Sequence, residues 1–120
     1  MSDAKSVFKR YLDAFTRGDT EAAAACLTED FDFAGPMVQV KGKAAFLEQT
    51  QGLLPIVRGY EMLDQIAEGE RVSSFYEFLV ETPKGKGAIK MMESCTLRDG
   101  KLATSRLVFN TPDLVALMPQ

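Results

Sequence analysis

Two glutamates on neighbouring predicted strands are the side chains in this sequence best suited to acid–base chemistry. The 120 residues include no histidine, so proton transfer falls to Asp, Glu, Tyr or Lys. Glu77 and Glu93 lie in two long segments, 72–82 and 87–97, that are rich in β-branched and aromatic residues. Because alternate residues of a strand face the same side of a sheet, a hairpin that sets residues 77 and 93 opposite each other places both carboxyl groups on one face.

Two carboxyl groups in one apolar cavity cannot both ionise at low cost, so the pKa of one of them rises. The ionised group can then act as a general base, and we predict this role for Glu77. In the alternative, a hairpin register shifted by one residue sends one glutamate to the opposite face. There it is solvated, or paired with Lys90 or Arg106.

The same alternation predicts the wall of a substrate-binding cavity. The residues that share a face with Glu93 are mostly apolar, which suits a hydrophobic small-molecule ligand. Asp30 and Asp32 have the opposite parity to Phe33 in an earlier strand and are predicted as surface or cap residues, with a bulge at Gly35 that turns Asp32 inward as the alternative. The predicted lining consists of Phe33, Phe75, Met91, Cys95, Ser105, Leu107 and Phe109.

Composition and charge exclude several other classes of protein. The 14 basic and 17 acidic residues give a net charge of −3, which argues against a basic face for nucleic acid. The longest apolar run, residues 22–27, is far shorter than the ~20 residues that span a bilayer. Residues 1–10 are polar and mixed, unlike a leader peptide. We therefore expect a soluble, cytoplasmic protein of one domain, residues 1–120, with no nucleic-acid or membrane partner.

We expect no metal, nucleotide or flavin site and no cofactor. Cys26 and Cys95 are too far apart in the sequence for the spacing of a metal knuckle. Both stand among apolar neighbours and are predicted as small buried hydrophobes, with a redox or nucleophilic role as the alternative. Gly85 and Gly87 are not followed by a helix start, so they form no phosphate loop.

Helices come first in this sequence and strands follow, an order typical of an α+β fold. Apolar residues at three- and four-residue steps predict a helix over 7–15 that ends at Gly18, and capping and composition favour further helices over 20–27 and 43–54. A strand over 30–35 stops at Pro36. The segments 72–82, 87–97 and 101–110 read as antiparallel strands joined by turns at 83–86 and 99–100, before a last helical turn.

This order and several short motifs resemble the nuclear transport factor 2-like superfamily, which includes ketosteroid isomerases and SnoaL-type polyketide cyclases. The motifs lie at residues 11–15 (YLDAF), 18–19 (GD), 28–31 (TEDF), 35–36 (GP), 42–46 (GKAAF) and 99–102 (DGKL), with Arg106 in the closing strand. The resemblance covers almost the whole chain. It implies a cone-shaped, curved antiparallel sheet with N-terminal helices packed over its concave face, a cystatin-like α+β barrel.

The ketosteroid isomerase pattern carries over to this sequence only in part. By resemblance, Tyr11 takes the place of the oxyanion-hole tyrosine, and Glu93 that of the protonated acid that donates a second hydrogen bond. Phe109 corresponds to an aromatic wall on the last strand. The isomerase base is the aspartate directly before the proline, and here that residue is Gly35, which cannot remove a proton.

Two functions remain open. The first is acid–base chemistry on a hydrophobic carbonyl compound, such as isomerisation, dehydration or cyclisation, with Tyr11, Glu77 and Glu93 as catalytic residues. The second is non-catalytic binding of a hydrophobic ligand, or a dimeric protein-interaction module. Gly35 at the position of the isomerase base favours the second.

The other face of the sheet is predicted to be too apolar to remain in contact with water. Members of the superfamily commonly pair through that face, so the resemblance implies a homodimer. The residues predicted there are Ser74, Tyr76, Phe78, Val80, Met92, Arg106 and Val108.

Overall fold

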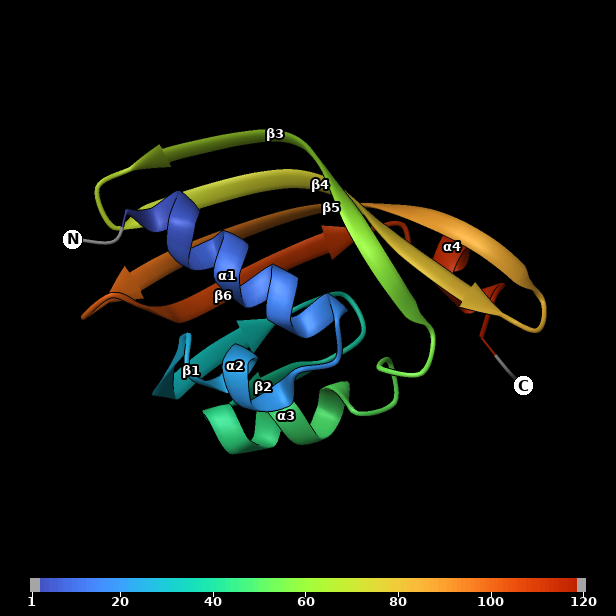
Figure 1. Cartoon of the computed structure of the whole chain (residues 1–120), viewed down its shortest axis with the longest axis horizontal. Helices are drawn as coiled ribbons and strands as arrows, with labels where there is room; N and C mark the ends of the chain where they lie inside the picture. The colour runs from blue at the N-terminus through green and yellow to red at the C-terminus, as the bar shows by residue number, and fades with distance from the viewer. Residues whose placement is uncertain (1–2, 119–120) are drawn as a thin grey trace.

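The computed structural model describes residues 3–118, which contain four helices and six strands (Figure 1). None of these helices is long and apolar enough to cross a membrane. Helices precede the four long strands, which confirms the α+β class. The elements are α1 (Ala4–Thr16), α2 (Thr20–Ala24), β1 (Leu27–Ala34), β2 (Gln39–Lys41), α3 (Lys43–Thr50), β3 (Val57–Glu68), β4 (Arg71–Thr82), β5 (Gly85–Arg98), β6 (Lys101–Phe109) and α4 (Thr111–Val115).

The first helix forms where the apolar stripe predicts it. The carboxylate of Asp3 caps α1 by accepting a hydrogen bond from the backbone N–H of Ser6 at 2.8 Å. The chain turns away at Gly18, whose φ of 79° lies in the left-handed region that glycine adopts without strain. The predicted stripe is buried, so α1 presents apolar and aromatic side chains to the sheet. Its members are Val7, Phe8, Tyr11, Leu12 and Phe15.

The six strands form one curved sheet in the order β2–β1–β6–β5–β4–β3, and α1 lies across its concave face (Figure 1). The sheet ends at β2 and β3, so it curves without closing. Neighbouring strands are antiparallel except β1 and β6, which pair in parallel. This pair differs from the expected antiparallel pattern, because the chain leaves β1 through β2 and α3 and returns beside it only as the last long strand.

Several elements in the first half of the chain differ from the sequence-based prediction. The helix α2 ends at Ala24 rather than Leu27, and β1 begins at Leu27 rather than at residue 30. The strand β2 has only three residues, too few for a recognisable alternation, and it forms because Val40 pairs with Phe33 of β1. The helix α3 ends at Thr50 rather than Leu54, and residues 51–56 continue as turns. Gly52 lowers the helix propensity of that segment.

The hairpin of β4 and β5 has a different register from the predicted one. Its turn consists of residues 83–84 alone, because Thr82 already pairs with Gly85. Counting back from this tight turn, Ser74 is the residue directly opposite Glu93. The even-numbered residues of β4 therefore share the concave face with Glu93.

The odd-numbered residues of β4 lie on the convex face, which corrects two predicted positions. Glu77 pairs with Lys90 on one side and with Glu61 of β3 on the other, and Phe75 pairs with Met92. Glu77 and Glu93 therefore do not share the cavity. The prediction that Glu77 and Phe75 belong to its wall is wrong.

Packing against α1 explains why the even-numbered face of β4 is inside. The ring of Tyr76 lies 6.1 Å from that of Phe8, and the ring of Phe78 lies 6.2 Å from that of Phe15, measured between centroids. Each contact buries two aromatic rings at once. The predicted convex set is thus wrong for four of its seven residues. Ser74, Tyr76, Phe78 and Val80 are buried on the concave side, while Met92, Arg106 and Val108 are exposed on the convex side.

Candidate functional site

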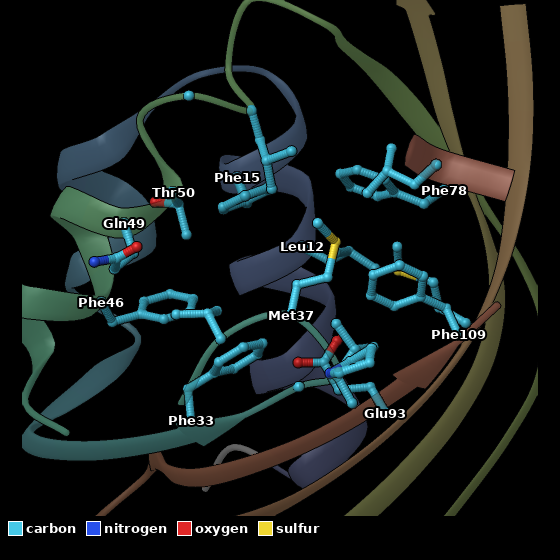
Figure 2. Close-up of a pocket in the computed structure, with 18 of the residues that line it drawn as sticks. Leu12, Phe15, Phe33, Met37, Phe46, Gln49, Thr50, Phe78, Glu93 and Phe109 are labelled. Carbon is cyan, nitrogen blue, oxygen red and sulfur yellow. The ribbon is translucent and has the colours of Figure 1, made fainter. Parts of the chain in front are cut away.

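A cavity of about 320 Å³ lies between the concave face of the sheet and the helices (Figure 2). Its wall receives side chains from α1, β1, α3, β4, β5, β6 and the C-terminal segment, and most of them are apolar. A cavity of this size and character is suited to a small organic molecule. Its aromatic side chains are Tyr11, Phe15, Phe33, Phe46, Tyr76, Phe78 and Phe109.

Most of the predicted site residues reach this cavity. Cys95 and Ser105 are buried on the same side of the sheet but do not form part of its wall. Glu77 and Phe75 are absent from it, as the hairpin register requires. The predicted residues that line the cavity are Tyr11, Phe33, Met91, Glu93, Leu107 and Phe109.

Glu93 is the polar centre of the cavity wall. Its side chain projects from β5 toward the cavity (Figure 2), and the residue is only 4% exposed. Tyr76 Oη donates a hydrogen bond to Oε1 at 2.7 Å, and Ser105 Oγ donates one to Oε2 at 2.5 Å. Loss of solvation on burial raises the pKa of Glu93 above its usual 4.5, although both hydrogen bonds act to lower it.

Tyr11 contributes a hydroxyl group to the same wall. No residue of 3–118 forms a hydrogen bond with it. Every enclosed polar side-chain atom in that range has a hydrogen-bond partner, so the unpaired hydroxyl of Tyr11 is not enclosed and opens into the cavity. Burial, and next the nearby charge of Glu93, raise the pKa of Tyr11 well above 10. Tyr11 is therefore a neutral phenol that can donate a hydrogen bond to a ligand.

Tyr76 is the main site residue that the sequence-based prediction missed. Its ring lines the cavity and its hydroxyl holds Glu93. The period-2 alternation of β4 would have identified it, but the assumed register assigned Tyr76 to the outer face. Ser105 was predicted as a contact of the ligand, whereas the structure gives it a contact with Glu93.

The edge of the cavity carries another group of residues that the sequence did not reveal. Met37, 53% exposed, projects from the loop after β1 toward the cavity interior (Figure 2). Gln49 and Thr50 come from the end of α3, and Leu114 and Met118 from the C-terminal segment. These residues are brought together from loops and helix ends, so no local sequence pattern marks them.

Gly35 lines the cavity at the position where the isomerase pattern has its base. A Cβ at this residue would lie 3.1 Å from Cε1 of Phe33 and 3.8 Å from Cβ of Leu107. The ring of Phe33 thus occupies the space beside Gly35, and it continues into a contact with Phe46 at a centroid distance of 5.0 Å. An aromatic wall stands where the isomerase pattern places a carboxylate.

The acidic side chains of β1 point away from the cavity, as predicted. Asp30 pairs with Arg98 at 2.6 Å, and this hydrogen bond, with a second from Thr28, lowers the pKa of Asp30 to about 2. Asp32 lies 3.7 Å from Arg106. Residues 3–118 contain no cluster of three or more His, Cys, Asp or Glu side chains arranged to hold a metal ion.

Known proteins have a similar sequence pattern and the same architecture. Residues 8–105 match the model of a family described as the SnoaL-like domain. No match was found among the curated proteins. Among solved structures, the chain is similar to a nuclear transport factor 2-like protein of unknown function from Cytophaga hutchinsonii, with a TM-score of 0.82, 19% identity and 96% of each chain covered.

Two further solved structures have the same architecture. One is TerC, co-crystallised with polyporic acid, with a TM-score of 0.82 and 20% identity over 97% of this chain and 98% of that chain. The other is a candidate polyketide cyclase from Xanthomonas campestris pv. campestris, with a TM-score of 0.79 and 23% identity over 95% of each chain. At these identities the similarity shows the fold alone.

The expected fold is thereby confirmed. The curved sheet covered by N-terminal helices is shared with nuclear transport factor 2-like proteins over almost the full chain. The family model extends from α1 to β6 and so includes both Tyr11 and Glu93. This chain belongs to the SnoaL-like domain family.

Proposed function

We propose that the chain binds a neutral, apolar carbonyl compound in the cavity and performs acid–base chemistry on it with Glu93 and Tyr11. The observation that carries the proposal is a buried carboxyl group with a raised pKa in a largely apolar cavity, which also holds a free phenol hydroxyl. Perturbed carboxyl groups in such surroundings are typical of acid–base catalysts. Relatives described as cyclases and isomerases have the same fold.

The lining of the cavity supports a neutral ligand. Among the described lining residues there is no Lys or Arg, and Glu93 is the only carboxyl group. A phosphate or carboxylate in this cavity would therefore lack a cationic partner and would face Glu93. A carbonyl oxygen could instead accept a hydrogen bond from Tyr11 while the rest of the molecule contacts aromatic and methionine side chains.

The proposed step moves one proton. The carboxylate of Glu93 removes a proton from the carbon next to the carbonyl group, and the C–H electron pair shifts to the carbonyl oxygen, which accepts a hydrogen bond from Tyr11. Glu93 then returns that proton to a carbon atom of the product, which regenerates the carboxylate. One carboxyl group acts as base and then as acid, so the cycle does not need Glu77.

The test is deuterium exchange at the carbon next to a ketone, followed by proton NMR in heavy water. The probes are 1-indanone and 1-tetralone, apolar bicyclic ketones that are small enough for the cavity. We expect exchange above the buffer rate with the parent chain, and a loss of about 10²-fold or more in Glu93→Gln. Exchange that is equal in the parent chain, Glu93→Gln and buffer would contradict the proposal.

The alternative function is non-catalytic binding of the same class of ligand. Two observations favour it: Gly35 stands at the isomerase base position, and Glu77 lies outside the cavity. In that case 1-indanone would shift the NMR signals of lining residues without exchanging its protons. Glu93→Gln would then change affinity alone.

We also propose that the chain forms a homodimer through the convex face of the sheet. Phe75, Met92 and Val108 form a cross-strand row on that face, and Val108 is 63% and Met92 45% exposed. Ile66 of β3, 69% exposed, adds to this apolar surface. Apolar side chains gathered on one face in this way are typical of an interface. Light scattering after gel filtration measures the mass in solution.

A further inference from the structure

We infer that Tyr76 and Ser105 are positioning residues that keep the carboxyl group of Glu93 hydrogen-bonded in both of its protonation states. Each carboxyl oxygen has its own hydroxyl partner: Tyr76 Oη at 2.7 Å from Oε1 and Ser105 Oγ at 2.5 Å from Oε2. The inference rests on the proposed function for the use to which Glu93 is put. The hydrogen bonds themselves do not depend on that function.

The two hydroxyl groups approach Glu93 from β4 and β6, the strands on either side of β5. Tyr76 on β4 pairs with Met91, and Ser105 on β6 pairs with Cys95, so each is a diagonal neighbour of Glu93 on the same face. The carboxyl group on β5 is thus held by one hydroxyl group from each neighbouring strand. This placement depends on the register that puts Glu93 on the concave face.

The ring of Tyr76 is itself held in place. It lies 6.1 Å from the ring of Phe8 on α1 and 6.3 Å from the ring of Tyr60 on β3, the latter in an edge-to-face arrangement. Ring packing on both sides restricts the side-chain rotamers of Tyr76. Its hydroxyl oxygen therefore stays within reach of Glu93 while the hydroxyl hydrogen can rotate.

Hydroxyl partners suit a carboxyl group that gains and loses a proton. A hydroxyl can both donate and accept, whereas Arg and backbone N–H groups only donate. When Glu93 is ionised, Tyr76 and Ser105 both donate to it. When Glu93 is protonated, its O–H can donate to one of these oxygens, whose hydrogen turns away, or to a ligand. Each oxygen of Glu93, Tyr76 and Ser105 therefore keeps a hydrogen-bond partner when the carboxyl group gains or loses its proton.

The other groups around Glu93 stay uncharged while it titrates. They are Tyr11 from α1, Tyr76 from β4 and Cys95 from β5, and the neighbour from β6 is Ser105. Burial first, and then the charge of Glu93, raise the pKa values of Tyr11, Tyr76 and Cys95 well above their usual ranges. The two hydroxyl groups are therefore the described partners that stabilise the carboxylate of Glu93.

The experiment measures the pKa of Glu93 by carboxyl ¹³C NMR in the ligand-free chain, for the parent and for Tyr76→Phe, Ser105→Ala and the double variant. Each single substitution removes one donor to the carboxylate, so we expect the pKa of Glu93 to rise further, and most in the double variant. The pH midpoint of ketone exchange should move upward in the same order. Each substitution deletes one oxygen atom and leaves the remaining packing in place.

Matched controls remove a hydroxyl group that does not touch Glu93. Tyr60→Phe deletes a hydroxyl that donates to Asp13 at 2.6 Å, and Ser94→Ala deletes one that pairs with Ser73 on the convex face. Both should leave the pKa of Glu93 unchanged. If Ser105→Ala does not fold, Tyr76→Phe alone decides the question.

An unchanged pKa of Glu93 in both Tyr76→Phe and Ser105→Ala would overturn the inference, and so would an equal rise in Tyr60→Phe. The two proposals fail in different ways. If the parent chain exchanges no ketone protons but the pKa of Glu93 rises in the variants, the positioning role stands and the catalytic function falls. If exchange depends on Glu93 but the pKa of Glu93 is unchanged in the variants, the catalytic function stands and the positioning role falls.

Discussion

Glu77 on β4 lies directly opposite Lys90 on the convex face of the sheet, three residues along β5 from Glu93 on the concave face. The register of one hairpin therefore separates the two glutamates that the sequence places on neighbouring strands. Glu93 keeps a buried, hydroxyl-bonded position at the cavity, while Glu77 is half-buried outside it. The predicted pair of carboxyl groups is replaced by one carboxyl group with two hydroxyl partners.

Replacing Glu77 with Gln should leave ketone exchange and ligand affinity unchanged within about twofold, because the side chain does not reach the cavity. The same change removes one of two like charges that face each other across β3 and β4, since Glu61 pairs with Glu77. It also removes the opposite charge that faces Lys90 on β5, so we expect the free energy of unfolding to change by no more than ~0.5 kcal/mol in either direction. Chemical denaturation and the exchange assay measure both effects. A tenfold loss of exchange would contradict the placement of Glu77.

Glu93 should make the chain less stable as the pH rises. Its pKa is raised in the folded chain above the usual 4.5, so between these two values the folded state binds more protons than the unfolded state. The contribution of the neutral group is complete below pH 4.5 and is lost as the pH rises through the folded pKa. Gln at position 93 does not titrate. The free energy of unfolding of the parent should therefore fall relative to that of Glu93→Gln as the pH rises from 4.5 through the folded pKa of Glu93.

Thermal unfolding of both chains at a series of pH values tests this dependence. Comparison with Glu93→Gln is necessary because other groups change stability in the opposite direction, such as Asp30 with its pKa of about 2. Parallel curves for the two chains would show that Glu93 titrates normally in the fold.

A side chain at position 35 should disturb the aromatic wall of the cavity. In Gly35→Ala the new Cβ lies 3.1 Å from a ring atom of Phe33, so this ring must move by a few tenths of an ångström. We expect a loss of about 1 kcal/mol in the free energy of unfolding and a several-fold weaker binding of 1-indanone. Gly52→Ala is the matched control, because Gly52 also lines the cavity and a Cβ there meets nothing within 4 Å. Equal effects of the two substitutions would contradict the explanation.

A charge in the apolar row of the convex face should prevent dimerisation. Met92→Glu places a carboxylate between Phe75 and Val108, which a second copy of the chain would have to bury. We expect the mass from light scattering to fall from that of two chains to that of one, with an unchanged fold by circular dichroism. Glu21→Lys on the exposed face of α2 is the control. A parent chain that is monomeric at all concentrations would refute the proposed dimer.

The sequence by itself determined the helices and most of the long strands, and its motifs indicated the superfamily. The apolar stripe of α1 consists of residues spaced three and four apart in the sequence. The ends of this helix depend on local groups such as Asp3 and Gly18. Strand alternation within β5 and β6 correctly grouped Met91, Glu93 and Cys95, because side-chain direction along one strand has a fixed period.

Only the tertiary structure decided which faces meet. A turn of three residues in place of the observed two, 83–84, would reverse the faces of β4 relative to β5, and the local sequence from 83 to 86 does not fix the turn length. Packing of Tyr76 and Phe78 against α1 selects the face that is buried, and these contacts join segments more than 60 residues apart in the sequence. The meeting of Tyr76, Glu93 and Ser105 on three strands follows from that choice. Alternation along one strand shows which residues share a face of the sheet. Which of the two faces is buried depends on packing against another element.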